Sequence, residues 1–337
     1  MPAGPRLSDD IAMAVRRIYS GAEVKTLRIL ADGLKRDLHK ANWAQRKLSK
    51  LGDVRRQIRS DVVQDYLGGY TDEIGKAVEA SYRQGMVGAE VDLQGVQDDV
   101  VSGFGEVHQN AVNKLAGDLT KSLEQTHVRI MRESEDVYRG VIGEVSGNAV
   151  TGVETRKQTS QRALNRFANR GVKGFRDSAD RAWTLGSYTE MATRTTVHNA
   201  HVEGHIQRMK DNDRDLVVIS SHTGSCSYCR PFQGRVLSIQ GNSEGSEYYT
   251  TLSEARAEGL FHPNCRHTMS AFFPGYTDLE KYKKHREESG ERYQALQEQR
   301  KNERKIRQWK KRKASAMDED ELLKAKRKVR EWQKRQR

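Results

Sequence analysis

Two short segments rich in cysteine and histidine constrain the fold of this 337-residue chain more than any other feature of its sequence. The first contains Cys226-x-x-Cys229, and the second contains His262, Cys265 and His267. A Cys-x-x-Cys turn places two thiolates on one edge of a tetrahedron, which suits Zn²⁺. Cys265 and one of the two histidines then complete four ligands. Such a closed site has no position for water, so the zinc we expect here is structural.

Other interpretations of these residues stay open. In one, the cysteines are simply buried and the histidines are hydrogen-bonded without a metal. In another, Cys226 and Cys229 form a redox pair, although no βαβ pattern precedes them. His222 precedes the pair by four residues and is a further candidate ligand. The odd number of cysteines, three, argues against a disulfide framework and favours a reducing compartment.

An enzymatic alternative rests on the helix upstream. His201-x-Glu203 followed by Cys226-x-x-Cys229 matches part of the zinc deaminase pattern, in which a glutamate moves protons. Ser225, however, stands where that pattern has proline, and Cys265 has no role in it. His198, His201 and His205 share this helix without forming an H-E-x-x-H motif, so we expect them to be core or surface residues. A deaminase-like or nuclease-like zinc enzyme, and a free nucleic-acid-binding protein, are therefore the alternative functions.

The hydrophobic pattern predicts an α+β protein with three consecutive parts. Residues 1–145 show helical periodicity, with Ser8 as a candidate N-cap, and are expected to form a mostly α-helical region. Gly143, Gly147 and Gly152 indicate a linker. Residues 146–280 predict a small α+β domain, because short β-branched runs at 215–220, 234–239 and 268–273 are each bounded by turn-forming residues. Residues 281–337 predict a basic helical tail, with a last helix opened by the acidic residues 318–321.

Charge is concentrated in this tail. Residues 281–337 contain 22 Lys and Arg against 10 Asp and Glu, so they carry +12 of the formal net charge of +13. A nearly neutral body with a basic tail indicates a polyanionic partner for the tail, such as double-stranded DNA. A solvated helix held against another protein is the alternative. The candidate DNA-contacting residues are Lys310, Lys311, Arg312, Lys313, Lys326, Arg327, Lys328 and Arg330.

The apolar content of 35% and the absence of a run of about 18 apolar residues argue against a membrane protein. The first ten residues also lack the apolar region of a secretory signal. We find no Walker loop, no G-x-G-x-x-G motif and no Ser-His-Asp signature, so no small-molecule substrate is indicated.

The sequence around the cysteines resembles that of a known protein family. Ser221-His222-x-Gly-x-Cys226-x-x-Cys229, then Gln233-Gly234-x-Val-x-Ser, and later His262-Pro-Asn264-Cys265-Arg266-His267 occur in order. Together with Arg194-Thr195 upstream, these motifs resemble the minor capsid proteins of tailed phages, which are related to the Mu F-like head morphogenesis family. The resemblance covers residues 185–277.

This resemblance implies a structural protein of the virion and no enzymatic activity. It implies a place in the head interior near the portal vertex, with assembly in the host cytoplasm. The expected partners are the portal protein and the major capsid or scaffold protein, and the expected role is in head assembly and in genome packaging or delivery. Residues 1–145 would dock on the portal or shell. Arg194, Thr195, Gln233, Gly234, Asn264 and Arg266 are expected to be structural motif residues.

Overall fold

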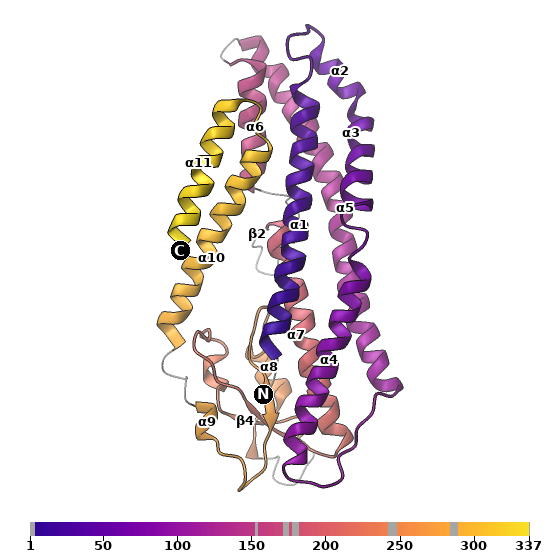
Figure 1. Cartoon of the computed structure of the whole chain (residues 1–337), viewed down its shortest axis with the longest axis vertical. Helices are drawn as coiled ribbons and strands as arrows, with labels where there is room; N and C mark the ends of the chain where they lie inside the picture. Colours follow the sequence, from indigo (N-terminus) through magenta and orange to yellow (C-terminus); the bar gives the residue numbers. More distant parts are fainter. Residues whose placement is uncertain are drawn as a thin grey trace. The chain divides into compact units, whose positions relative to one another are not determined.

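The computed structural model describes residues 4–151, 154–170, 175–176, 182–241, 248–283 and 289–336. These residues are mostly helical, and they also form a three-stranded and a two-stranded antiparallel sheet (Figure 1). The α+β class expected from the sequence is therefore confirmed. No described helix is both long enough and apolar enough to span a bilayer.

Long helices make up the first half of the chain. In order, the elements are α1 (Gly4–Lys35), α2 (Trp43–Ser49), α3 (Leu51–Ile58), the π-helical turn η1 (Arg59–Gln64), α4 (Thr71–Gln94), α5 (Glu106–Thr151) and α6 (Arg156–Arg170).

The second half of the chain mixes short strands with helices. Its elements are β1 (Phe175–Arg176), β2 (Ala182–Trp183), α7 (Leu185–Asp211), β3 (Leu216–Ile219), the 3₁₀ turn η2 (Arg230–Phe232), β4 (Val236–Ser238), α8 (Leu252–Ala257), β5 (Met269–Ala271), α9 (Glu280–Lys283), α10 (Ser289–Ala314) and α11 (Glu319–Gln336).

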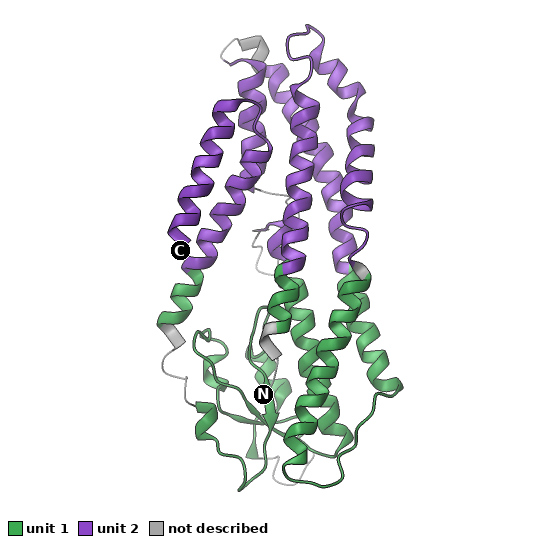
Figure 2. Ribbon diagram, in the orientation of Figure 1, with its two compact units in different colours: residues 1–13, 71–121, 190–297 green, residues 14–70, 122–189, 298–337 purple. Residues whose placement is uncertain are grey.

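The chain divides into two compact units, each assembled from three separate stretches (Figure 2). Unit 1 comprises residues 1–13, 71–121 and 190–297, and unit 2 comprises residues 14–70, 122–189 and 298–337. Each of the three consecutive parts expected from the sequence contributes residues to both units. Helices such as α5 begin in one unit and end in the other.

The three strands predicted in unit 1 are confirmed and form one sheet in the order β4-β3-β5. The central strand β3 pairs antiparallel with both neighbours, so Val217 lies opposite Leu237 on one side and Ala271 on the other. Its last three residues are fully buried. Strands of three or four residues are too short to be stable alone, so this sheet depends on what packs against it.

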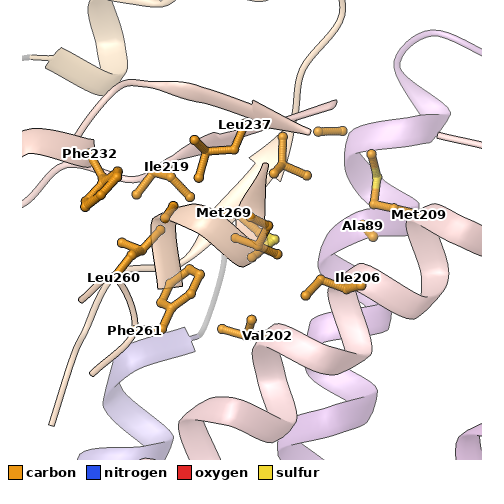
Figure 3. Close-up of a cluster of buried hydrophobic side chains, with 14 of the residues drawn as sticks. Ala89, Val202, Ile206, Met209, Ile219, Phe232, Leu237, Leu260, Phe261 and Met269 are labelled. Atoms are coloured by element: carbon orange, nitrogen blue, oxygen red, sulfur yellow. The ribbon is translucent and has the colours of Figure 1, made fainter. Parts of the chain in front are cut away.

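A cluster of buried apolar side chains joins the sheet to two helices of unit 1 (Figure 3). Ala89 and Leu93 come from α4, whereas Val202, Ile206 and Met209 come from α7. Each large apolar side chain that is fully buried contributes about 1.5–3 kcal/mol. Two cysteines, Cys229 and Cys265, belong to the same cluster, so the core borders the candidate metal ligands.

Two glycines allow α4 and α7 to approach each other closely. A Cβ atom at Gly85 of α4 would lie 1.9 Å from the carbonyl oxygen of His201 in α7. A Cβ atom at Gly204 of α7 would lie 2.1 Å from the carbonyl oxygen of Tyr82 in α4. Because these neighbours are backbone atoms, neither clash can be relieved by a side-chain rotation.

Unit 2 is held together partly by buried polar contacts of α10 and α11. The ammonium of Lys311 in α10 forms an ion pair with Glu23 of α1 at 2.7 Å, and both side chains are almost fully buried. The amide of Gln161 in α6 bonds the turn between α10 and α11 twice. It donates to the carbonyl oxygen of Ser315 at 3.3 Å and accepts from the N–H of Met317 at 2.5 Å.

Two local expectations are wrong. Ser8 is not an N-cap, because α1 begins at Gly4 and places Pro5 in the first turn, where a missing N–H is tolerated. Gly143 and Gly147 do not form a linker, because α5 continues through both to Thr151, while Gly152 lies outside the described residues. Burial of neighbouring side chains such as Val145 offsets the poor helix propensity of glycine there.

The basic tail is helical as expected. Asp318 accepts a hydrogen bond from the N–H of Glu321 at 2.8 Å and so caps α11, in line with the predicted acidic start of that helix.

The glycine contacts generate the first prediction. Gly85→Ala is expected to destabilise the protein by about 2 kcal/mol or more, because the helices must separate to admit the methyl group. Gly75→Ala is the matched control: it lies in the same helix, and no atom lies within 4 Å of its added Cβ. It is expected to be neutral or to stabilise by up to about 1 kcal/mol. Urea unfolding of both variants measures the difference, and equal midpoints would contradict the close approach.

Candidate metal centre

The first cysteine segment follows β3 and is shaped by turns. The N–H of Arg230 bonds the carbonyl oxygen of Cys226 at 3.0 Å, which folds the Cys-x-x-Cys segment back on itself. The turn η2 follows directly and leads to Gly234, whose N–H bonds the carbonyl oxygen of Ile219 at 3.0 Å. Gly234 has a φ of +69°, and a Cβ atom there would lie 2.7 Å from Lys283, so only glycine fits without strain.

The second segment lies between α8 and β5. The N–H of Cys265 bonds the carbonyl oxygen of His262 at 2.9 Å, which closes a tight turn. Asn264 inside this turn has a φ of +68°, a left-handed conformation that asparagine tolerates better than most residues. The turn directs His262 and Cys265 toward the first segment.

The structure brings donors from both segments together. The Sγ of Cys226 lies 2.9 Å from Nε2 of His262, and the Sγ of Cys229 lies 3.6 Å from the Sγ of Cys265. Two sulfurs bound to one tetrahedral zinc, each at about 2.3 Å, would be about 3.8 Å apart. The Cys229–Cys265 separation is close to that value.

Two overlapping groups of donors share Cys229. Cys226, Cys229 and His262 form one group, and Cys229, Cys265 and His267 form the other. Within each group all ligand atoms lie within 4.8 Å of one another. The second group is fully buried, whereas Cys226 and His262 are half-buried.

Proton sharing within the cluster separates the cysteine pKa values. A hydrogen bond from Cys229, assisted by His262, lowers the pKa of Cys226 to about 3. A hydrogen bond from Cys229 also lowers the pKa of Cys265, with help from His198 and His267. The pKa of Cys229 is raised, because its proton lies between these two sulfurs. The hydrogen bond to Cys226 raises the pKa of His262 to about 9. The cluster thus favours the thiolate form at Cys226 and Cys265, the thiol form at Cys229 and the charged form of His262.

The remaining histidine candidates lie beside the sulfurs. Nδ1 of His267 lies 3.4 Å from the Sγ of Cys265, and its Nε2 lies 3.4 Å from Ser225 Oγ. The ring of His222 packs against that of His267 with centroids 4.3 Å apart. Burial lowers the pKa of His222, and its Nε2 is buried without a hydrogen-bond partner in the described structure. His222 is in neither donor group.

Sequence reasoning missed His198 as a neighbour of the cluster. This α7 residue helps to lower the pKa of Cys265, and its ring lies 5.8 Å from that of Phe261. Its position more than 60 residues before Cys265 gave no local signal, and we had expected a core or surface role for it.

An ion-pair network attaches α7 to the second segment. The guanidinium of Arg194 donates to Asp9, Glu190 and Asn264, each at 2.8 Å. Arg194 is buried, and the neighbouring Glu190 and Asp9 carboxylates outweigh the effect of burial and raise its pKa.

Three other motif residues complete the support of the two segments. Arg266 pairs with Asp9 at 2.9 Å, and the N–H of Asn264 donates to Thr195 Oγ1 at 3.3 Å. In the first segment, buried Gln233 accepts from Ser221 at 3.1 Å and donates to the carbonyl oxygen of His222 at 3.5 Å. The motif residues thus hold the backbone that carries the cysteines.

The deaminase layout is not assembled in the described part of the chain. His201 belongs to neither donor group, and Glu203 pairs with Arg256 on the surface at 2.7 Å. Burial, together with His205 and His198, lowers the pKa of His201 to about 4, so it is neutral at neutral pH. His205 faces Asp92 at 3.5 Å. The three histidines are buried core residues of α7.

The candidate DNA-contacting residues differ in accessibility. Lys311 is buried against Glu23, and Arg312 pairs with Glu321 at 2.8 Å, so both side chains already form ion pairs within unit 2. Lys328 is half-exposed and pairs with Glu331 at 2.7 Å. The others are exposed or half-exposed: Lys310, Lys313, Lys326, Arg327 and Arg330.

Comparison with known proteins extends the resemblance beyond the cysteine region. A protein from Lactococcus phage LL-H, described as a structural protein, is 25% identical over 186 residues. This region is 53% of the present chain and 50% of that protein, so the chain spans about half the length of the curated relative it matches. No solved structure shows significant similarity. The family model of phage minor capsid protein 2 matches residues 4–337, and the chain therefore belongs to this family of phage minor capsid proteins.

Proposed function

We propose that this phage minor capsid protein acts in the head beside the portal, where it takes part in head assembly and in packaging or delivery of the genome. The observation that carries the proposal is the family match over residues 4–337, which includes the helical N-terminal region and the basic tail as well as the cysteine segments. The protein would work by binding other virion components and would have no catalytic activity.

Mass spectrometry of purified particles tests this assignment. The chain is expected in DNA-filled particles at far lower abundance than the major capsid protein, and crosslinking is expected to join its N-terminal helices to the portal. Its presence in infected cells but absence from gradient-purified particles would contradict the assignment and favour a free nucleic-acid-binding protein.

The metal proposal is that Cys226, Cys229, Cys265 and His262 hold one structural Zn²⁺. Three sulfurs and one imidazole suit zinc. Cys226 lies against His262 and Cys229 lies against Cys265, and Cys229 belongs to both donor groups, so zinc would draw Cys265 toward Cys226 and His262. His262 is favoured over His267 because it lies against Cys226, whereas His267 is also within reach of Ser225 and packs on His222. Zinc would displace the protons of Cys229 and His262 and join the loops on either side of the small sheet.

This site would supply folding free energy and no reaction. Four protein ligands leave no open position for a water nucleophile or a substrate. The ion would hold together a sheet whose longest strand has four residues.

A set of substitutions tests the metal proposal. Full-length protein is expected to retain about one zinc per chain after dialysis, and zinc binding at pH 7 is expected to release about two protons. Cys229→Ser is expected to abolish retention, and His262→Ala is expected to weaken zinc affinity about 10–100-fold more than His267→Ala. His39→Ala, at an exposed histidine outside the cluster, is the control. Elemental analysis and calorimetry in buffers of different ionisation enthalpy give the two readouts; zinc retention by Cys229→Ser would contradict the ligand set.

The DNA proposal concerns the exposed cations of α10 and α11. Lys311, Arg312 and Lys328 pair with Glu23, Glu321 and Glu331. The other five of the eight candidates form no ion pair with a carboxylate in the described structure: Lys310, Lys313, Lys326, Arg327 and Arg330. Contacts of this kind would neutralise phosphates without reading sequence, so binding should be steeply salt-dependent.

Replacing those five residues by glutamine tests the contact. The slope of log Kobs against log salt for duplex DNA is expected to fall by about 4, since each phosphate contact contributes about 0.9. The control replaces five exposed cations of unit 1 by glutamine and so makes the same change in net charge: Lys76, Lys114, Lys121, Arg235 and Arg292. Fluorescence anisotropy over a salt series measures both. If the two variants change the slope equally, the tail is not the DNA contact.

A further inference from the structure

A pocket in unit 2 collects cationic side chains from two separate stretches of the chain. It lies between α1 and the α2–α3 segment, with Tyr138 of α5 also lining it, and its volume is about 350 Å³. Five cationic residues line it: Lys25, Arg28, Arg36, Lys47 and Lys50. This volume is at the small end of the range for ligand sites.

The acidic residues that line the same pocket already have partners. Asp32 pairs with Lys35 at 3.7 Å, and Asp53 pairs with Arg56. Asp61 accepts a hydrogen bond from Gln57 at 3.3 Å. Neither Lys35 nor Arg56 is among the residues lining the pocket. None of these three carboxylates forms an ion pair with a cation that lines the pocket in the described structure, and the five cations outnumber them.

One of the cationic side chains that line the pocket, Lys47, is buried. The residue is 2% exposed, and its Nζ donates to the carbonyl oxygen of Gly33 at 2.6 Å. Gly33 lies in the last turn of α1, so this bond caps the helix and compensates part of the charge. No ion pair of Lys47 with a carboxylate occurs among the described residues, and an ammonium has three protons to donate.

The surroundings of Lys47 are unfavourable for its positive charge. Burial lowers the pKa of Lys47, and the neighbouring charges of Lys50 and Arg36 lower it further, while Asp37 opposes them. A buried charge without an opposite charge is costly. An anion in the pocket would supply that opposite charge and would also meet the guanidinium groups of Arg28 and Arg36, whose planar donors suit phosphate oxygens.

We propose that this pocket binds a phosphate group, with Lys47 as the buried contact and Arg36 and Lys50 among the exposed contacts. Two sources share this chemistry, free phosphate and a backbone phosphate of nucleic acid. The site lies on elements other than α10 and α11, so it is independent of the proposed tail contact with DNA.

Calorimetry of the full chain with inorganic phosphate at constant ionic strength tests the site. Saturable binding is expected, together with a rise in Tm of about 2–4 °C at saturating phosphate. Arg36→Met changes an exposed residue and should preserve the fold while lowering phosphate affinity about tenfold or more. Lys47→Met should abolish binding even where it also costs stability. Lys334→Met, at an exposed residue of α11 outside the pocket, makes the same charge change and should leave affinity unaltered.

A second arm uses a short DNA duplex in place of phosphate. If Arg36→Met weakens duplex binding more than Lys334→Met does, the pocket takes a backbone phosphate; if it weakens only phosphate binding, the ligand is a free phosphate. Either result supports the site. Absence of saturable phosphate binding, or equal effects of Arg36→Met and Lys334→Met on phosphate affinity, would overturn it, whatever the tail substitutions show.

Discussion

The approach of Cys229 to Cys265 is the contact on which unit 1 depends most. These residues are 36 positions apart, yet their sulfurs lie 3.6 Å from each other and belong to the same buried cluster as α4, α7 and the sheet. The three strands have only three or four residues each, so backbone hydrogen bonds between them cannot hold the sheet alone. The two cysteines are part of the buried cluster that packs against this sheet. The proposed ion would therefore add folding free energy at a sheet whose strands are too short to be stable alone.

Arg194 and the motif residues near it act on backbone geometry. Arg194 of α7 binds Asp9, Glu190 and Asn264, so it links the start of α1 to the turn that carries Cys265. Each nitrogen of the buried guanidinium donates to one oxygen, and two of these oxygens belong to carboxylates, which is the condition under which a buried charge is tolerated.

Local features of the fold could be predicted from the sequence, whereas its long-range organisation could not. The three strands and the acidic start of α11 follow from β-branched runs and charge placement, which act over a few residues. The glycine linker was a wrong prediction because burial of residues such as Val145, a tertiary effect, overrides helix propensity. The two interleaved units depend on helices that continue from one unit into the other, for which a single sequence has no local signal.

The same distinction between local and long-range features applies to the candidate site. Five of the six candidate metal ligands come together in the two donor groups, because Cys-x-x-Cys and a second cysteine–histidine segment are local patterns, whereas His222 lies outside both groups. His198 was missed because its contact with Cys265 exists only once α7 packs beside the second segment. Lys311 was assigned to DNA because its charge is visible in the sequence, whereas its burial against Glu23 is not.

The most direct test of the central claim is X-ray absorption spectroscopy at the zinc edge on the full-length protein. The account predicts three sulfur ligands at about 2.3 Å and one nitrogen ligand at about 2.0–2.1 Å. A spectrum with oxygen and nitrogen ligands only, or protein that folds fully with no zinc to measure, would contradict it.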